Sequence, residues 1–206
     1  ISNMRLQSLS SCGDIAVSVY SGWLAYSTFD HEWVKQQMKE TSVEEVLEKN
    51  WPGLHIEPLQ APENMEVLIG WTGSPASSPH LVSEVKRLKS DPIFYGEFLE
   101  QSNTCVENLI YAFKTNNIKG VQKMIRQNRS IIQQMDKEAT VDIETKKLKL
   151  LCEIGERFGG AAKTSGAGGG DCGITIIDNK VDKSSIYEVW EKEGIKPLKF
   201  KIYHGQ

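Results

Sequence analysis

The sequence contains little that would support a metal centre, a disulfide framework or a membrane anchor. Its four cysteines and four histidines are scattered, with no CxxC pair and no zinc-ligand spacing. No apolar run approaches the roughly 18 residues that a membrane-spanning helix needs, and the first residues do not resemble a signal peptide. These absences predict a reduced, cytoplasmic protein with no metal-ligand set of its own.

Excess positive charge is also absent. The chain has 24 Lys and Arg against 27 Asp and Glu, a formal net charge of -3. Because affinity for nucleic acids and anionic membranes comes from clustered Lys and Arg, this balance argues against both as general partners. Any site for an anion must therefore be local.

The remaining composition, with 39% hydrophobic and 25% charged residues among 206, is typical of one large or two small globular domains. A connector with room for one edge strand is expected at 51–64, where prolines and a glycine interrupt the pattern, so a domain boundary is predicted near residue 60. Before it, β-branched and aromatic residues at 14–29, broken at Ser21 and Gly22, predict two strands joined by a turn. A partly helical stretch is expected over 31–50.

The second part of the chain is predicted to alternate strands and helices. Strands are expected at 65–73, 173–177 and 197–205, the last from alternating apolar and Lys residues. Helices are expected from Ser78, from Asp91, over 118–135, over 143–158 and over 183–193. This order predicts an α+β fold with helices on one face of an antiparallel sheet.

The stretch "AAKTSGAGGGDCGITIID" (161–178) is the most unusual in the chain. Glycines beside a strand usually make a tight turn, but one short turn does not require four of the five residues 166–170 to be glycine. Such a loop also lets backbone N–H groups converge on an anion, and Lys163 and Ser165 add further donor types. No strand is predicted to lead into the loop, and the Lys precedes the glycines, so the pattern is not a Walker P-loop.

Two carboxylates stand out near small-residue loops. Asp171 closes the glycine loop, where it can either accept hydrogen bonds from loop amides or orient a Lys or a Mg²⁺-bound water. Asp14 follows "SSCG", and by itself it is typical of an Asx turn to nearby backbone. Residue types alone leave both roles of Asp171 open.

Three separated stretches resemble the GHMP kinases, a family of ATP-dependent small-molecule kinases. They are "SSCGDIAVSVYSGW" (Ser10–Trp23), "LIGWTGSPASSPHLV" (Leu68–Val82) and "AAKTSGAGGGDCGI" (Ala161–Ile174), in the family's order. The form of the third, with Ser165 and Asp171, is most similar to the bacterial phosphomevalonate kinase branch. The resemblance extends over most of the chain.

The family's Pro- and Gly-Ser-rich motif, which wraps the ATP phosphates, and its early Lys-containing segment have no counterpart here. Because the chain also starts at Ile1 rather than Met, we expect that an N-terminal segment of the same enzyme is missing. The resemblance then implies that residues 1–60 are the C-terminal part of the family's N-terminal, ATP-binding domain. Residues 61–206 would be its C-terminal domain, with a ferredoxin-like antiparallel sheet backed by helices.

The resemblance also implies a reaction and a set of site residues. The expected reaction transfers the γ-phosphoryl of ATP, with Mg²⁺, to (R)-5-phosphomevalonate and gives 5-diphosphomevalonate and ADP. Asp14 and Lys163 are the expected catalytic residues, with Asp14 orienting a Lys of the missing segment. The expected substrate- and phosphate-binding residues are Ser11, Ser77, Ser78, Ser165, Gly166, Ala167, Gly168, Gly169, Gly170 and Asp171.

Two alternatives remain open at this point. One is a sibling kinase that acts on mevalonate or another small alcohol. The other is a non-catalytic α+β module whose glycine loop holds an anion. Neither alternative requires a nucleic acid or a membrane as partner.

Overall fold

The structure is a computed structural model that describes residues 11–76, 91–166 and 168–203. The chain divides into two compact units, one containing Ile1–Gln60 and Lys201–Gln206 and the other Ala61–Phe200. It passes from the first unit to the second after Gln60 and returns at Lys201. The end of the chain therefore groups with the first unit by its contacts, and the predicted assignment of 1–60 and 61–206 to two family domains stays a prediction.

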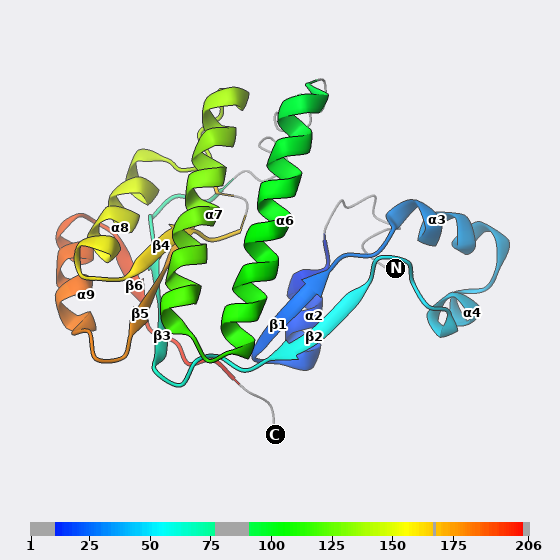
Figure 1. Cartoon of the computed structure of the whole chain (residues 1–206), viewed down its shortest axis with the longest axis horizontal. Coiled ribbons are helices and arrows are strands. Elements are labelled where there is room, and N and C mark those ends of the chain that lie inside the picture. Colours follow the sequence, from blue (N-terminus) through cyan, green and yellow to red (C-terminus); the bar gives the residue numbers. More distant parts are fainter. Residues whose placement is uncertain (1–10, 77–90, 167, 204–206) are drawn as a thin grey trace. The chain divides into compact units, whose positions relative to one another are not determined.

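The first unit is built on a two-stranded antiparallel sheet (Figure 1). Strand β1 (Trp23–Ser27) pairs with β2 (His55–Leu59), with Trp23 opposite Leu59 and Ser27 opposite His55. The helices of this unit are α2 (Gly13–Tyr20), α3 (His31–Glu40) and α4 (Val43–Glu48).

The helix α2 corrects the prediction of two strands over 14–29. Residues 13–20 are helical, and the break at Ser21 and Gly22 is a helix end rather than a turn between strands, with φ of 64° and 65° at the two residues. A left-handed residue is a common way to end a helix, and a short apolar run does not separate helix from strand. Only Ala16 of this helix is buried.

Side-chain capping fixes the starts of the next two helices. The Asp30 carboxylate accepts hydrogen bonds from the amides of Glu32 and Trp33, and the Ser42 hydroxyl accepts one from Glu45. Between these helices lies a small core of Phe29, Val34 and Val46, with Trp51 packed edge-on against Phe29. The partial helix expected over 31–50 is confirmed as two short helices.

The second unit contains a four-stranded, fully antiparallel sheet in the order β4-β5-β3-β6. Its strands are β3 (Met65–Trp71), β4 (Ala161–Thr164), β5 (Cys172–Asp178) and β6 (Lys196–Leu198). Its helices are α6 (Pro92–Lys114), α7 (Ile118–Ala139), α8 (Lys146–Arg157) and α9 (Lys183–Lys192). With α6 to α8 in the first crossover and α9 in the second, the order is β-α-β-β-α-β, which is the ferredoxin-like arrangement.

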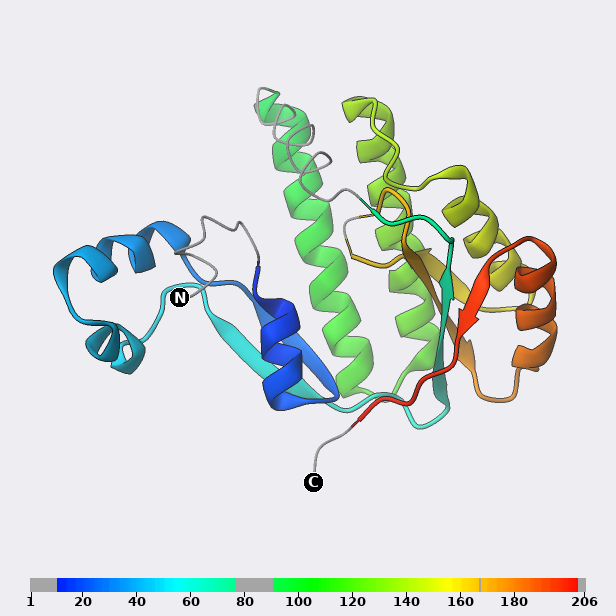
Figure 2. The same ribbon diagram turned by 180° about the vertical axis from the view of Figure 1, so that it is seen from behind.

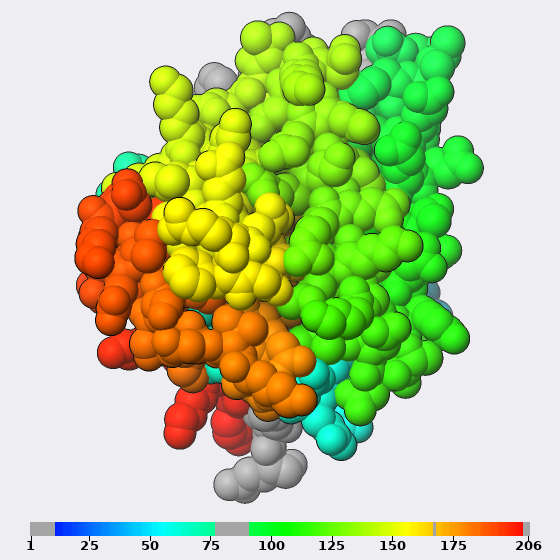
Figure 3. Space-filling view, turned by 60° about the vertical axis from the view of Figure 1, so that its left-hand side comes forward, coloured from blue at the N-terminus to red at the C-terminus, as the bar shows by residue number. Residues whose placement is uncertain are grey.

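The sheet is covered on one face by α8 and α9, where the main core lies. Gly70 of β3 and Gly173 of β5 face this core, and a Cβ at Gly70 would lie 2.8 Å from Leu151 Cδ1. Figure 3 shows α8 (yellow) between α7 (green) and α9 (orange to red). The fully buried side chains of this core include Leu68, Leu151, Ile177, Ile186, Trp190 and Ile195.

Helices α6 and α7 form an antiparallel pair, and α7 packs along β4 (Figures 1 and 2). The predicted start of α6 is confirmed, since Asp91 accepts hydrogen bonds from the amides of Ile93 and Phe94, with Pro92 at the first helical position. The helix expected from Ser78 lies outside the described residues. No helix in the described ranges is long and apolar enough to cross a membrane.

The final strand and α8 have other bounds than predicted, and one strand of the second unit was not predicted. The final strand ends at Leu198, because it pairs only with Ile69–Trp71 of β3 before the chain returns to the first unit. Helix α8 begins at Lys146 rather than near 143, because Thr145 is its N-cap. A strand does lead into the glycine loop, namely β4, which sequence reasoning missed because "AAKT" is short and lacks β-branched residues before Thr164.

Candidate functional site

The glycine loop joins β4 to β5 at one end of the sheet. The ladder between these strands continues one step into the loop, where the Ser165 amide donates to the Cys172 carbonyl over 2.9 Å. The chain after β3 lies alongside, because Thr72 N donates to Asp171 O over 2.8 Å and Asp171 N donates to Ser74 O over 2.7 Å. The structure thus brings the glycine loop together with the Thr72–Ser74 segment.

The loop amides fall into two groups. Those of Ser165, Gly169 and Asp171 are bound to backbone carbonyls, with Gly169 N donating to Ile143 O over 2.7 Å. The amides of Gly166, Gly168 and Gly170 have no acceptor within the described part of the chain. Since buried amides nearly always have a partner and Gly168 and Gly170 are buried, these three N–H groups are the donors that an anion could use.

The individual glycines of the loop are required for different reasons. Gly166, Gly168 and Gly170 all have left-handed φ, of 63°, 76° and 127°. A Cβ at Gly168 would lie 2.4 Å from Ile143 Cγ2, which excludes a side chain there, and one at Gly170 would lie 3.1 Å from Ser74 O, which leaves little room for one. A Cβ at Gly166 would meet nothing within 4 Å. Packing within the protein therefore does not require glycine at this position, and close approach of a ligand is the favoured reason for it.

Lys163 lies on β4, before the loop rather than at its mouth. Its half-buried ammonium donates to the Thr164 carbonyl over 2.6 Å, and burial lowers the pKa of Lys163 below its usual value. Thr164 is only 1% exposed, and its hydroxyl has no hydrogen-bond partner in the described ranges. The predicted catalytic role of Lys163 stays a prediction.

Replacing Lys163 by Met is expected to raise the free energy of unfolding at pH 7. The folded state holds a partly buried cation with a lowered pKa, whose desolvation costs free energy. Between that lowered pKa and the usual value of 10.5, the unfolded chain binds more protons than the folded one, so the wild type gains stability as pH rises. The advantage of Lys163→Met over the wild type should therefore shrink between pH 7 and pH 10 in urea unfolding; an equal advantage at both would contradict this account.

Asp171 is exposed and has a left-handed φ of 58°. Its carboxylate accepts a hydrogen bond from Cys172 Sγ at 3.6 Å, and no loop amide in the described ranges donates to it. Burial, with the nearby Asp171 charge, raises the pKa of Cys172 to about 11. The carboxylate of Asp171 is thus available to a cation, while the neighbouring thiol stays protonated and unreactive at neutral pH.

The remaining predicted site residues lie in the first unit or outside the described ranges. Asp14 is exposed in the first turn of α2. Ser11 is held through its carbonyl, which accepts hydrogen bonds from Tyr26 Oη at 2.5 Å and Thr28 Oγ1 at 3.1 Å. Ser77, Ser78 and Ala167 lie outside the described residues.

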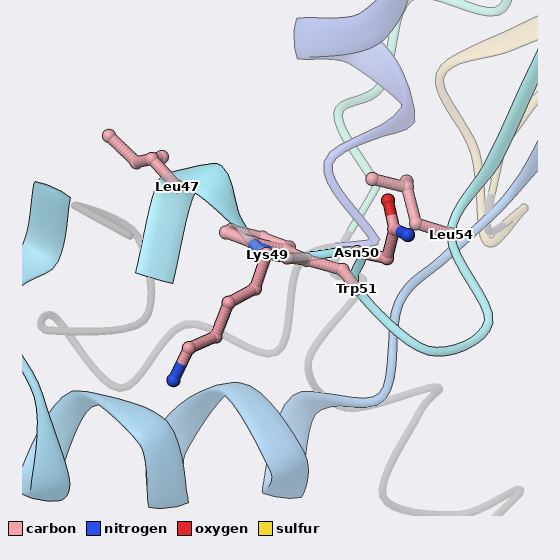
Figure 4. A pocket seen from close by; sticks show the side chains of 5 residues that line it. All are labelled: Leu47, Lys49, Asn50, Trp51 and Leu54. Carbon is pink, nitrogen blue, oxygen red and sulfur yellow. The ribbon is translucent and has the colours of Figure 1, made fainter. Parts of the chain in front are cut away.

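A hollow of about 500 Å³ is present in the first unit (Figure 4). Its lining is already engaged within the unit, since Lys49 Nζ donates to Gln37 Oε1 and Trp51 Nε1 donates to the Val46 carbonyl. It contains none of the predicted site residues, its lining being Leu47, Lys49, Asn50, Trp51 and Leu54. These contacts are structural, and we assign no ligand to the hollow.

Metal ligands are not clustered in the part of the chain that the structure describes, where no group of three or more His, Cys, Asp or Glu side chains could hold an ion. Mg²⁺ in nucleotide sites needs only one or two carboxylates, because phosphate oxygens and water complete its coordination. The exposed carboxylate of Asp171 suits that mode. A resident metal held by protein ligands alone does not fit these residues.

The sequence of the second unit matches a known family. Residues 109–196 match the model of the GHMP kinases C-terminal family, and these residues include α7, α8, α9, the glycine loop and both of its strands. The chain carries a GHMP kinase C-terminal domain. The fold predicted from the resemblance is confirmed.

Similarity to individual proteins extends beyond the GHMP kinase C-terminal domain into the first unit. The chain is 35% identical over 201 residues to a phosphomevalonate kinase of Streptomyces sp. (strain CL190). Among solved structures, it is similar to a Lin0012 protein from Listeria innocua, with a TM-score of 0.92 and 40% identity. It is also similar to the Streptococcus pneumoniae phosphomevalonate kinase in complex with phosphomevalonate and AMPPNP, with a TM-score of 0.85 and 26% identity.

These similarities cover nearly all of this chain but only part of each relative. The alignments include 96% of this chain and 54% of the Streptomyces enzyme. The corresponding shares are 98% and 57% for the Listeria protein, and 98% and 58% for the Streptococcus enzyme. The chain thus spans a little over half the length of the relatives that it matches.

Proposed function

We propose that this chain is part of a phosphomevalonate kinase, which transfers the γ-phosphoryl of ATP to (R)-5-phosphomevalonate and releases 5-diphosphomevalonate and ADP. The reaction belongs to the mevalonate pathway of isoprenoid synthesis. The observation that carries the proposal is the 35% identity to a phosphomevalonate kinase over 96% of the chain, across both units. The Streptococcus relative with phosphomevalonate and AMPPNP points to the same pair of substrates.

The glycine loop supplies the chemistry that a phosphoryl transfer needs from this unit. Phosphate oxygens accept hydrogen bonds from backbone amides, and those of Gly166, Gly168 and Gly170 are not used by described carbonyls. Amides fixed before the reaction stabilise developing charge without reorganising. In this proposal, Ser165 and the loop residues 166–170 bind phosphate oxygens.

The acceptor does not require a strong general base. The second pKa of a phosphate monoester is about 6, so (R)-5-phosphomevalonate is mostly a dianion at neutral pH and is already nucleophilic. The harder task is to bring it close to the polyanionic ATP, which requires cations and amides in fixed positions. Bound Mg²⁺ would neutralise charge on the ATP phosphates, with Asp171 as the carboxylate near the loop.

Asp14 has the features expected of a positioning carboxylate in the active site. It is exposed in the first turn of α2, and its carboxylate has no hydrogen-bond partner in the described ranges. In this proposal Asp14 orients a catalytic Lys, while Lys163 is the second catalytic residue and Ser11, Ser77 and Ser78 contact substrate. The Lys that Asp14 orients would come from the N-terminal segment of the complete enzyme.

The surface of α2 supports a polypeptide partner for the first unit. Ile15, Val17, Val19 and Tyr20 are 47%, 46%, 72% and 52% exposed, whereas large apolar side chains on one short helix are normally buried. Because the chain spans only 54% of the Streptomyces relative, we propose that the rest of the enzyme covers this helix. Residues 1–60 would then complete the N-terminal, ATP-binding domain of the family, and 61–206 would form its C-terminal domain.

The experiment that tests the function is coupled ADP release by the complete enzyme with ATP and Mg²⁺. (R)-5-phosphomevalonate and mevalonate are supplied as acceptors in parallel. Turnover with phosphomevalonate but not with mevalonate is the expected result. Turnover with mevalonate alone would identify the sibling kinase instead.

The non-catalytic alternative makes a different prediction in the same assay. A folded, complete chain would then bind inorganic phosphate or ATP but release no ADP with either acceptor. Equilibrium binding of labelled ATP alongside the assay separates this outcome from a protein that has failed to fold. ATP binding without turnover would overturn the kinase proposal.

A further inference from the structure

Helix α7 contains a row of polar side chains, most of which donate to or accept from residues near β4 and in the turn before α8. Gln122, Arg126, Arg129, Gln133 and Asp136 follow one another at alternating intervals of four and three residues, which places them on one stripe of the helix. We call these five residues the polar seam. Gln122 and Arg129 are buried, at positions where such a stripe is normally apolar, so the polar seam needs an explanation.

The two ends of the polar seam hold different parts of the unit. At one end, Gln122 Nε2 donates to the Gly159 and Ile176 carbonyls, and Arg126 donates to the Gly160 carbonyl over 2.5 Å. These contacts hold the start of β4. The contacts of Arg129, Gln133 and Asp136 instead lead to the turn between α7 and α8, which contains Ile143 and Glu144.

That turn is held by charged side chains, of which Arg129 and Glu144 are buried. Arg129 Nε donates to Glu144 Oε1 over 2.9 Å, and its Nη1 lies 3.1 Å from Glu156 Oε2. The side chains of Arg129 and Glu144 are 10% and 3% exposed. Gln133 Nε2 donates to the second oxygen of Glu144 over 2.7 Å, so both oxygens of this buried carboxylate are bound.

Asp136 fixes the backbone of the same turn. Its Oδ1 accepts from the Ile143 amide at 2.6 Å, and its Oδ2 accepts from the Glu144 amide at 2.9 Å. Burial raises the pKa of Asp136, and these two amides oppose that rise. The carboxylate therefore determines the orientation of two consecutive peptide units.

The glycine loop rests on this turn. The Ile143 carbonyl accepts the Gly169 amide at 2.7 Å, and Ile143 is the residue that leaves no room for a side chain at Gly168. Gly168 and Gly169 thus contact Ile143, one of the two residues whose amides donate to Asp136. A shift of Ile143 would move the loop amides that flank the anion position.

We propose that the loop end of the polar seam, formed by Arg129, Gln133 and Asp136 with Glu144, positions the glycine loop for phosphoryl binding. These are positioning residues that act through Ile143 and do not touch the substrate. The kinetic part of this proposal rests on the proposed function, whereas the ordering of the loop does not. Apolar side chains in place of the polar seam could supply the same stability. We therefore attribute the buried charge on α7 to placement of the loop.

The test is Asp136→Asn in the complete enzyme. Asn keeps the size of the side chain but presents an NH₂ group to one of the two amides, so one hydrogen bond is lost. Hydrogen exchange of the peptide 161–172, which contains the Gly169 amide, is expected to accelerate about tenfold. The value of kcat/KM for the proposed kinase reaction should fall about tenfold or more, because small misplacements of binding groups reduce rates strongly.

Arg126→Met is the matched control from the other end of the polar seam. It removes the hydrogen bond to the Gly160 carbonyl but leaves the Ile143 turn unchanged. The midpoint of urea unfolding should fall as for Asp136→Asn, while exchange near Gly169 and the kinetic constants stay at the wild-type values. If Asp136→Asn does not fold, Gln133→Met, which removes a partly buried hydrogen bond to Glu144, provides the same comparison.

Loop exchange and kinetic constants of the two variants together test the positioning role. Faster loop exchange in Asp136→Asn but not in Arg126→Met supports it, with or without kinase activity in the wild type. Absence of kinase activity in the wild type would remove the proposed function and leave the ordering of the loop standing. Equal exchange and equal kinetic constants in both variants, with lowered stability alone, would overturn the positioning role.

Discussion

Replacing Asp14 by Asn in the complete enzyme should lower kcat by about a hundredfold to a thousandfold, with little change in KM. The magnitude is that of removing one preorganised electrostatic group from an active site. Phosphoryl transfer depends almost entirely on positioning and charge stabilisation, so a carboxylate that orients a catalytic Lys is needed mainly in the transition state. Steady-state kinetics with (R)-5-phosphomevalonate and ATP measure both constants.

The matched control for this variant is Glu44→Gln. Glu44 is also an exposed carboxylate in the first turn of a helix, α4, so both variants lose a similar interaction with the helix dipole, about 0.3–1 kcal/mol. The control should keep the wild-type kcat. A similar kcat in Asp14→Asn would assign Asp14 a role in the start of α2 rather than in catalysis.

Replacing Gly168 by Ala should destabilise the second unit by roughly 2–5 kcal/mol. Two costs add: a left-handed φ of 76° with a side chain and a Cβ that would lie 2.4 Å from Ile143 Cγ2 and 2.5 Å from Ile143 O. The Ile143 carbonyl belongs to the turn held by Asp136, so a shift of this carbonyl would also strain the hydrogen bonds to Asp136. Urea unfolding measures the loss, and phosphate binding should fall with it.

Gly166→Ala separates backbone strain from contact with a ligand. Its φ of 63° is also left-handed, but a Cβ there meets nothing within 4 Å, so the cost in stability is about 1–2 kcal/mol. If a phosphoryl group passes close to Gly166, this variant should lose kcat/KM far beyond its loss of stability. Unchanged kinetics in a folded Gly166→Ala enzyme would place the phosphoryl group elsewhere on the loop.

The architecture of the second unit was predictable because its signals are local and strong. Asp91-Pro92 marks the start of α6, Gly159 and Gly160 mark the end of α8, and the apolar strand after the glycine loop is β5. The first unit was harder to predict because α2 has the composition of a strand and buries only Ala16. Composition cannot predict such a helix, because most of its apolar side chains are exposed and no buried face marks a helical period.

The glycine loop was predictable as a feature, but the reason for each glycine was not. Gly168 and Gly170 depend on contacts with Ile143 and Ser74, which lie 25 or more residues away in sequence, so no local pattern contains them. The charged positions Arg129 and Asp136 on α7 were a usable signal, because buried charges at core spacing need specific partners. For Lys163 no such signal exists, since its sequence position beside the loop does not indicate that its side chain is partly buried on β4.

The chain leaves the first unit after Gln60 and returns to it at Lys201, where the Gly22 amide donates to the Tyr203 carbonyl over 2.8 Å. The second unit is therefore a continuous insertion, and all of its strands and helices are synthesised before the last segment of the first unit emerges from the ribosome. Since domains generally fold as units during synthesis, the later unit in sequence is able to fold before the earlier one is complete. Until then, the Gly22 amide just after α2 lacks the Tyr203 carbonyl that accepts its hydrogen bond in the finished unit.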